Sequence, residues 1–269
     1  MLRITVGRAL GAVSVAVFAS VNVPSASPSS ASLSRAFVPT SDHAAGYTFD
    51  IVTKATSSST IAGLSSGMTA TGIVGPDGAI RMDITALEGS SMSAVGDYYI
   101  VKDGRMLLVR PGTKTFVDVG DPPVAADMTI SGVTVASETV AGGHLIEGRA
   151  TEHLRTTVGY TQGVMGQSIP TTIVTDYWLA KLSVPMINPM AAVKNAGTSG
   201  PTAELVKKQL EVAPAASSGV ALKAVITTTR SAMGRTIVAT VTTEMKNVKE
   251  GNVDVSKIVM PAGYTKALR

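Results

Sequence analysis

The sequence predicts a mainly β protein of the α+β class, built as one curled antiparallel sheet of about ten strands with two inserted helices lying against its inner face. Three observations lead to this prediction. Short runs alternate apolar and polar residues, turn-forming residues separate these runs, and the apolar period changes late in the chain, near residues 185–213. A sheet of that size usually curls or closes to protect its edges.

Alternation with a period of two marks the strands. The run from Tyr47 to Ile51 alternates apolar and polar side chains, and the run from Ile80 to Thr85 does the same. Such a pattern places one set of side chains on a core and the other in water, which is typical of half-buried antiparallel strands.

Turn residues join these strands into a meander. The segment Gly75–Gly78 reads Gly-Pro-Asp-Gly between two strands. Asp103 and Gly104 stand between two more, and an Asp-Gly pair favours a two-residue hairpin turn because both positions need a positive φ. The expected strands are 47–51, 69–74, 79–85, 98–102, 105–110, 115–119, 133–140, 152–160, 171–181, 220–230 and 236–245.

Two short helices are expected where the period changes, at 185–193 and 202–212, on either side of a Gly/Ser/Pro segment at 197–201. Pro201 stands near the start of the second helix, where its missing N–H costs little. The chain from residue 37 to residue 269 is therefore predicted to form a single domain with a helical insertion near 185–213.

The N-terminus has the pattern of an export signal. Arg3 and Arg8 precede an apolar run at 9–23, which small and polar residues follow. We expect residues 1–36 to be a signal peptide and flexible leader, with cleavage between 26 and 36. The apolar run is shorter than the ~20 residues that a spanning helix needs, so a retained anchor is the alternative reading. Cleavage would leave a periplasmic or secreted protein with no permanent membrane span.

Composition excludes several classes of protein. The chain has no cysteine, so it can carry neither a disulfide nor the acylated cysteine of a bacterial lipoprotein. The net charge is +4 and falls to +2 once Arg3 and Arg8 are removed. Nucleic-acid binding usually needs a concentrated basic patch, often with stacking aromatic residues. No Lys/Arg cluster follows the leader, and aromatic residues make up only 4% of the sequence. We expect no nucleic-acid partner.

The sequence offers little catalytic chemistry. Gly63–Gly67 matches the G-x-S-x-G pattern of a hydrolase nucleophile elbow, which requires a strand before the serine and a helix after it. A Ser/Thr run precedes this segment and a strand is expected after it. The three histidines are scattered without zinc-ligand spacing. We therefore expect no enzyme activity, no metal and no cofactor, although a hydrolase remains a distant third reading.

His153 is one candidate partner for a catalytic serine. It stands between Glu152 and Arg155 in an expected strand, on a face that alternates with the apolar one. The simpler interpretation is that these three side chains form a solvated polar face.

Three short segments resemble a known superfamily. They are 99–105 (Tyr-Ile-Val-Lys-Asp-Gly-Arg), 148–155 (Gly-Arg-Ala-Thr-Glu-His-Leu-Arg) and 260–264 (Met-Pro-Ala-Gly-Tyr). With the order of elements, they are similar to the lipoprotein-sorting superfamily of LolA, LolB and LppX, and within it to a group of bacterial exported proteins of unknown function. The resemblance implies an incomplete β-barrel covered by helices, with an apolar cavity that holds acyl chains in the better-known relatives. The chain departs from anchored members in lacking the cysteine.

Methionine is the compositional oddity, with twelve residues. Met186 and Met190 are four residues apart and would share one face of a helix. They could pack on the sheet core, line a pocket for a hydrophobic ligand, or form a thioether copper site. Of the neighbours Tyr177 and Trp178, one is expected to face the helices. The candidate ligand-binding residues are Trp178, Met186, Ile187, Met190 and Leu205.

These expectations lead to two hypotheses about function. The first is an exported periplasmic binding protein for a lipid, acyl chain or other hydrophobic ligand, resembling a lipoprotein carrier. The alternative is a non-catalytic structural or interaction protein of the cell envelope, with a packed interior and an envelope protein as its partner. Cavity volume separates them, because ligand sites are usually preformed hollows of about 300 Å³ or more.

Overall fold

The computed structural model describes residues 43–58, 66–89, 93–103, 105–119, 128–164, 166–186, 203–212, 219–232 and 234–267. The expected signal peptide and leader, residues 1–36, lie outside these ranges, so export and cleavage stay predictions. Within the described ranges, none of the helices has the length and apolar character needed to cross a bilayer.

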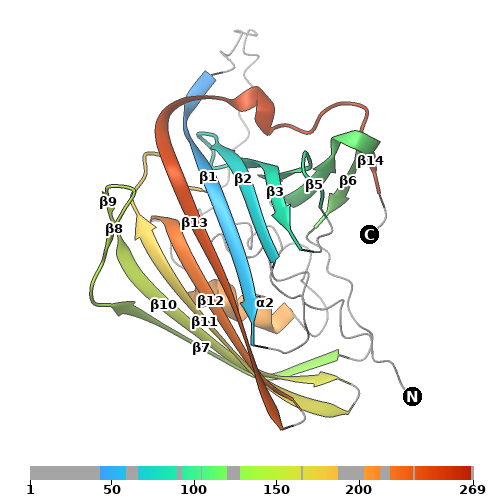
Figure 1. The fold of residues 1–269 in the computed structure, drawn as a ribbon, viewed down its shortest axis with the longest axis vertical. Coiled ribbons are helices and arrows are strands. Elements are labelled where there is room, and N and C mark those ends of the chain that lie inside the picture. The colour runs from blue at the N-terminus through green and yellow to red at the C-terminus, as the bar shows by residue number, and fades with distance from the viewer. Residues whose placement is uncertain are drawn as a thin grey trace, which may run out of the picture.

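Twelve of the described strands form one curled, open sheet in the order β14-β6-β5-β4-β3-β2-β1-β13-β12-β11-β10-β7 (Figure 1). Its pairings are antiparallel except for that of β14 with β6. The predicted fold class is confirmed, with somewhat more strands than expected. The strands are β1 His43–Ser57, β2 Ser66–Val74, β3 Ile80–Glu88, β4 Tyr98–Lys102, β5 Arg105–Arg110, β6 Thr115–Asp118, β7 Met128–Val140, β10 Glu152–Val164, β11 Gln167–Ala180, β12 Val220–Ala232, β13 Arg235–Asp254 and β14 Thr265–Lys266.

The sheet consists of two wings that meet at β1 and β13. The N-terminal wing, β1–β6, and the C-terminal wing, β7 with β10–β13, are each built from neighbouring strands. The antiparallel pairing of β1 with β13 joins them, and places Ile51 opposite Met245 and Thr53 opposite Thr243. This one pairing connects segments almost 200 positions apart in the sequence.

The inner face of the sheet is the face that carries Ile51. On β1, the alternating residues Tyr47, Phe49 and Ile51 are at most 2% exposed, as the sequence predicts. They belong to one apolar cluster that also contains Leu222 of β12 and Met245 of β13. The inner faces of the two wings therefore form one continuous surface.

In the N-terminal wing the outer face is covered as well. Tyr98 and Val109 on β4 and β5 are buried on this side and pack with Met260 and Tyr264 near the C-terminus. The Arg81 guanidinium lies 3.8 Å from the centre of the Tyr98 ring, a favourable cation–π geometry. Because both of their faces are buried, β4 and β5 are almost wholly apolar. The C-terminal segment then adds β14 beside β6.

Turn chemistry follows the sequence prediction. Gly78 has a φ of 77° and donates its N–H to the Gly75 carbonyl oxygen over 2.9 Å. Asp103, between β4 and β5, has a φ of 52°, a value that Asp tolerates better than most residues. Both hairpins form where the Gly-Pro-Asp-Gly and Asp-Gly segments indicate.

Helices are few in the described chain. The second expected helix is present as α2, Ala203–Val212, and two 3-10 turns occupy Pro111–Thr113 and Val255–Ile258. The first helix is expected at 185–193, but Pro185 and Met186 are not helical. The rest of that segment lies outside the described residues.

A small hairpin, β8 Leu145–Ile146 and β9 Arg149–Ala150, is joined to β13 by an ion pair and a hydrogen bond. The Arg149 Nη1 lies 2.7 Å from Oε1 of Glu250, and the Ser183 N–H donates to Oε2 of the same carboxylate over 2.7 Å. The Asn247 N–H donates to the Glu147 carboxylate over 2.9 Å. Glu250 thus joins the hairpin and the segment after β11 to one point of β13.

Hydrogen bonding from Ser183, together with the charge of Arg149, lowers the pKa of Glu250 below its ordinary value. A lowered folded-state pKa means that Glu250 stabilises the fold fully above its ordinary pKa of 4.5, and that this stabilisation is lost as the pH falls through the lowered value. We predict that Glu250→Gln lowers the urea midpoint at pH 7, and that its difference from wild type shrinks between about pH 5 and about pH 3. Glu138→Gln, at an exposed position of β7, controls for loss of a surface carboxylate. A difference between Glu250→Gln and wild type that stays constant with pH would contradict this role.

Candidate functional site

The inner face of the C-terminal wing carries an apolar strip at its centre. Val241 lies opposite Ala55 on one side and Ile226 on the other, and Ala224 lies opposite Tyr177. Val241, Ile226 and Ala224 are at most 8% exposed. We call this set the inner strip, and its members are Ala55, Ile173, Tyr177, Ala224, Ile226 and Val241.

The helix α2 covers the far end of this face. Leu205, 9% exposed, packs with Val158 and Tyr160 of β10 and with apolar residues of β7. Ile173 of β11 contacts this cluster and also belongs to the inner strip. In Figure 1, α2 lies behind β12 and β13, so it is on the side of the sheet away from the viewer. The strip therefore runs from the β1–β13 junction towards the helix.

Hydroxyl groups interrupt the strip but add no charge. Thr53 and Thr243, which are paired across β1 and β13, bond through their hydroxyls at 3.1 Å. The Tyr177 hydroxyl bonds to the side chains of Thr175 and Thr156, while burial raises its pKa to about 12. These groups are neutral at physiological pH and satisfy one another, so the strip has apolar character with no acid or base to perform proton transfer.

Of the expected site residues that the structure describes, Leu205 alone lies beside the inner strip. Met186 is 3% exposed but belongs to the core cluster that includes Val184 and the N-terminal wing. Ile187 and Met190 fall outside the described residues. The sequence reasoning missed Ala224, Ile226 and Val241, although their period-two spacing within the predicted strands 220–230 and 236–245 was a usable signal.

Trp178 lies on the outer face, because Tyr177 occupies the inner one. The Trp178 indole stacks on the His153 ring with centroids 4.5 Å apart and planes 13° from parallel. His153 Nε2 lies 2.7 Å from Oδ1 of Asp176, and Arg155 Nε donates to the same oxygen over 2.9 Å. The structure does not bring Trp178 together with Leu205.

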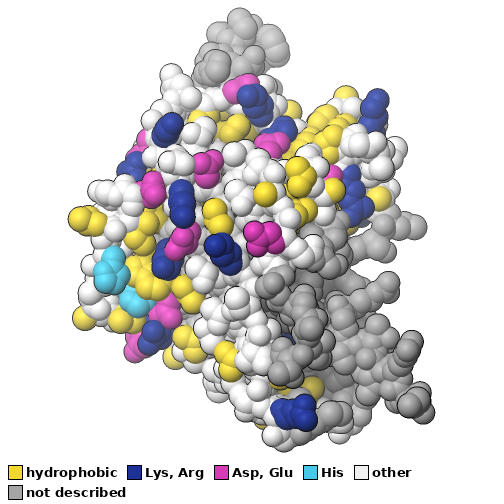
Figure 2. Space-filling view, in the orientation of Figure 1, with side chains coloured by type: hydrophobic (Ala, Val, Ile, Leu, Met, Phe, Trp, Pro, Cys, Tyr) yellow, Lys and Arg dark blue, Asp and Glu magenta, His cyan; other side chains and the backbone are white. Residues whose placement is uncertain are grey.

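The expectation of a solvated face at Glu152, His153 and Arg155 is wrong for His153, which is only 9% exposed. Its cross-strand neighbour Trp178 covers the ring, a contact that depends on the pairing of β10 with β11. Beyond this stack the outer face is charged. Lys223 and Lys246 both pair with Glu244, and Figure 2 shows basic and acidic side chains interspersed over this side of the molecule.

The residues that follow the serine of the hydrolase motif do not form the helix that a nucleophile elbow needs. Gly67 is part of β2, so the pattern continues into a strand where the elbow needs a helix. Residues 59–65 lie outside the described ranges. Among the described residues, no group of three or more His, Asp or Glu side chains is placed to hold a metal ion.

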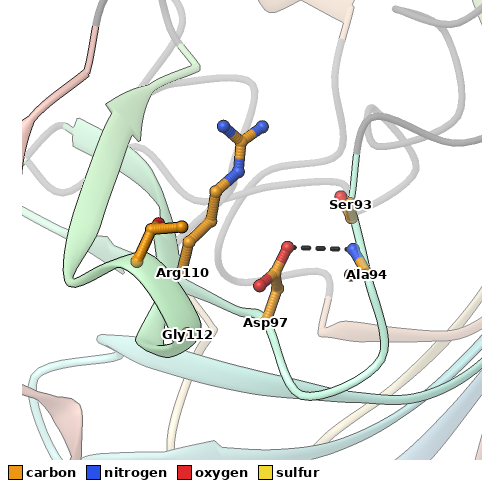
Figure 3. Close-up of a pocket in the computed structure, with 6 residues that line it drawn as sticks. Ser93, Ala94, Asp97, Arg110 and Gly112 are labelled. Carbon is orange, nitrogen blue, oxygen red and sulfur yellow. Dashed lines mark hydrogen bonds between the residues drawn. The ribbon is translucent and has the colours of Figure 1, made fainter.

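A separate hollow of about 310 Å³ lies on the N-terminal wing (Figure 3). Arg110 extends from β5 on one side of the hollow and Ser93 lies on the other, while the Asp97 carboxylate accepts the Ala94 N–H over 2.9 Å. The Ser93 hydroxyl bonds to that of Tyr99 at 2.8 Å. The lining residues are Ser93, Ala94, Asp97, Arg110, Gly112 and Thr113, and none belongs to the inner strip.

A comparison with solved structures finds similar chains at low identity. The chain is similar to a LolA superfamily protein from Nitrosomonas europaea, at 7% identity over 80% of this chain and 90% of that chain, with a TM-score of 0.30. An uncharacterized conserved protein from Thermus thermophilus matches at 10% identity over 82% and 90%, with a TM-score of 0.31. An outer membrane lipoprotein-sorting protein domain from Vibrio parahaemolyticus matches at 6% identity over 76% and 85%, with a TM-score of 0.27.

Two of these structures carry names that belong to the superfamily that the sequence resembles: a LolA superfamily protein and a lipoprotein-sorting protein domain. A scan against models of protein families finds no match, and a search of curated proteins finds none. At TM-scores this low the likeness carries nothing about ligand or partner.

We predict that Leu205→Ala loosens α2 from the sheet, because burial of Leu205 against Val158 and Tyr160 holds the helix in place. Removing a buried leucine side chain costs about 2–5 kcal/mol in a well-packed site. Hydrogen exchange of residues 203–212 should quicken while that of β1 and β13 does not change. Lys207→Ala, at an exposed position of the same helix, is the matched control. Unchanged exchange in α2 would show that Leu205 does not anchor it.

Proposed function

We propose that the protein is an exported binding protein of the cell envelope, and that it holds a lipid, an acyl chain or another hydrophobic molecule against the inner strip, between the curled sheet and α2. The observation that carries this proposal is the chemistry of the strip itself. It is apolar, uncharged and continuous over neighbouring strands of an open sheet. The location in the envelope rests on the export signal expected at residues 1–36.

The sizes of the side chains along the strip support a ligand there. Alanine occupies positions 55 and 224, so the side chains at the centre of the surface are short. Larger side chains stand at both ends, with Leu222 and Met245 towards the N-terminal wing and Tyr160 towards α2. A hydrocarbon chain lying on this surface would gain about 0.8 kcal/mol for each methylene group removed from water. Neutral hydroxyls would not oppose it, because they already bond to one another.

The second candidate is a structural or interaction protein of the envelope, and one observation favours it. The N-terminal wing is filled by its own side chains on both faces, as Tyr99 and Val101 on the inner side and Tyr98 and Ile100 on the outer side show, each at most 5% exposed. The inner strip is also buried, with Val241, Ile226 and Ala224 at most 8% exposed. If the chain's own side chains fill the space over it, no room is left for a ligand, and the surface of the protein would carry the function.

Filling the centre of the strip tests the proposal. We predict that Ala224→Leu lowers the affinity for a fluorescent fatty acid by about tenfold or more, because the added side chain occupies the part of the surface where the side chains are short. An added side chain in a packed region costs about 1–3 kcal/mol of stability, so thermal unfolding of each variant is measured beside binding. Ala55→Val is a milder change at the same surface and should weaken binding by a smaller factor.

Ala136→Leu, at an exposed position of β7, is the matched control and should bind as wild type does. Failure of the wild-type protein to take up any fatty acid would support the structural alternative. Binding that all three variants leave unchanged would place the ligand elsewhere.

A further inference from the structure

The end of the inner face nearest to the β12–β13 hairpin carries basic side chains. Arg230 continues the inner-face series of β12 after Ile226 and Thr228, and Arg235 is opposite Ala232 next to the turn. This hairpin lies at the lower end of the molecule in Figure 1. The run from Ala224 to Arg230 spans about 20 Å at the usual rise of a strand. A cation therefore stands beside the apolar strip, on the side of the β12–β13 hairpin.

Arg230 lies in a largely buried row. Its neighbour on β11 is Thr171, 2% exposed, which is opposite Tyr160, 9% exposed. Its neighbour on β13 is Ile237, which is 36% exposed. The row is thus closed on the side where α2 packs on Tyr160, and more open at Ile237. A molecule could reach the strip from this end.

The Arg230 Nε atom is buried and has no hydrogen-bond partner among the described residues. A buried donor on a cationic group normally finds an acceptor, because leaving it unpaired costs stability. Arg230 also forms no ion pair with any residue of the described chain. Among the described residues nothing supplies this acceptor, so an acceptor on a bound molecule would satisfy the donor.

Carboxylates are lacking on this part of the surface. From Tyr177 to the ends of the hairpins, the inner-face positions of the described strands β7 and β10–β13 include no Asp or Glu. On α2, Glu204 and Glu211 are exposed, and Glu211 pairs with Lys208 at 3.4 Å. An anion approaching Arg230 along the inner face of these strands would meet positive charge and no negative charge.

We infer that Arg230 binds the carboxylate or phosphate headgroup of an anionic amphiphile, whose apolar part lies on the inner strip, with Arg235 adding positive charge nearer to the hairpin turn. This inference rests on the function proposed above and narrows its ligand class. A guanidinium donates two parallel hydrogen bonds to a carboxylate or a phosphate, which gives both affinity and orientation. The headgroup would supply the acceptor that Nε lacks.

Two ligands that share a chain and differ in charge test the inference. Binding of dodecanoate and of dodecanol to the full protein is measured by calorimetry, for wild type, Arg230→Gln and Arg230→Lys. We expect Arg230→Gln to weaken dodecanoate binding by about tenfold or more and dodecanol binding by less than about twofold. Arg230→Lys keeps the charge, and its affinity for dodecanoate should lie between those of wild type and Arg230→Gln. Arg105→Gln, at an exposed arginine of β5, is the matched control and should change neither affinity.

If Arg230→Gln does not fold, the wild-type protein still provides a test. Added salt should weaken the binding of dodecanoate and leave that of dodecanol unchanged, because screening acts on the charged headgroup alone. Equal weakening of both ligands by Arg230→Gln would show a structural role and overturn the inference. Acetate or inorganic phosphate binding as tightly as dodecanoate would also overturn it, in favour of a site for free anions.

The same measurements separate this inference from the function on which it rests. If the wild-type protein binds both ligands, and neither Arg230→Gln nor salt changes their affinities, the proposed function stands and the role of Arg230 is overturned. Binding of neither ligand by the wild-type protein would overturn both.

Discussion

The structure depends on the antiparallel pairing of β1 with β13. It joins the two wings of the described sheet, and its register sets Ile51 against Met245 and Thr53 against Thr243. A shift of one residue would turn the buried side chains of one wing to the outside. The inner strip exists because this register aligns Ala55 with Val241 and so brings the apolar faces of both wings to the same side. Since the paired segments are distant in sequence, this junction is also expected to form late in folding.

The two faces of the C-terminal wing have opposite characters. The inner strip is apolar and neutral, and the hydroxyls beside it bond to one another. The outer face carries ion pairs such as that of Lys223 with Glu244, and the His153–Trp178 stack. Next to the strip, at the β12–β13 hairpin, the inner face carries the positive charges of Arg230 and Arg235. An amphiphile has the same division, an apolar body with a charged end, and the match between the two supports a binding role over an enzymatic one.

Much of the fold could be predicted from the sequence, because strands with one buried face alternate clearly, as Tyr47, Phe49 and Ile51 do. The proposed binding surface could not. Strands β10–β12 carry threonine on both faces, so alternation does not show which side of β11 faces α2. The sequence therefore favours Trp178 as a site residue, whereas Tyr177 is the one that belongs to the inner strip. His153 is buried by a residue of the next strand. Arg230 follows three threonines and looks like a solvent-facing residue until the register with Thr171 places it inside.

Native mass spectrometry of the protein purified from the cells that make it, compared with a spectrum under denaturing conditions, tests the central claim most directly. The account predicts a complex with one anionic amphiphile in the native spectrum, the mass of the chain alone after denaturation, and an extracted molecule with a carboxylate or phosphate headgroup. A native mass equal to that of the chain alone, unchanged after incubation with dodecanoate, would contradict it and favour a packed protein that acts through its surface.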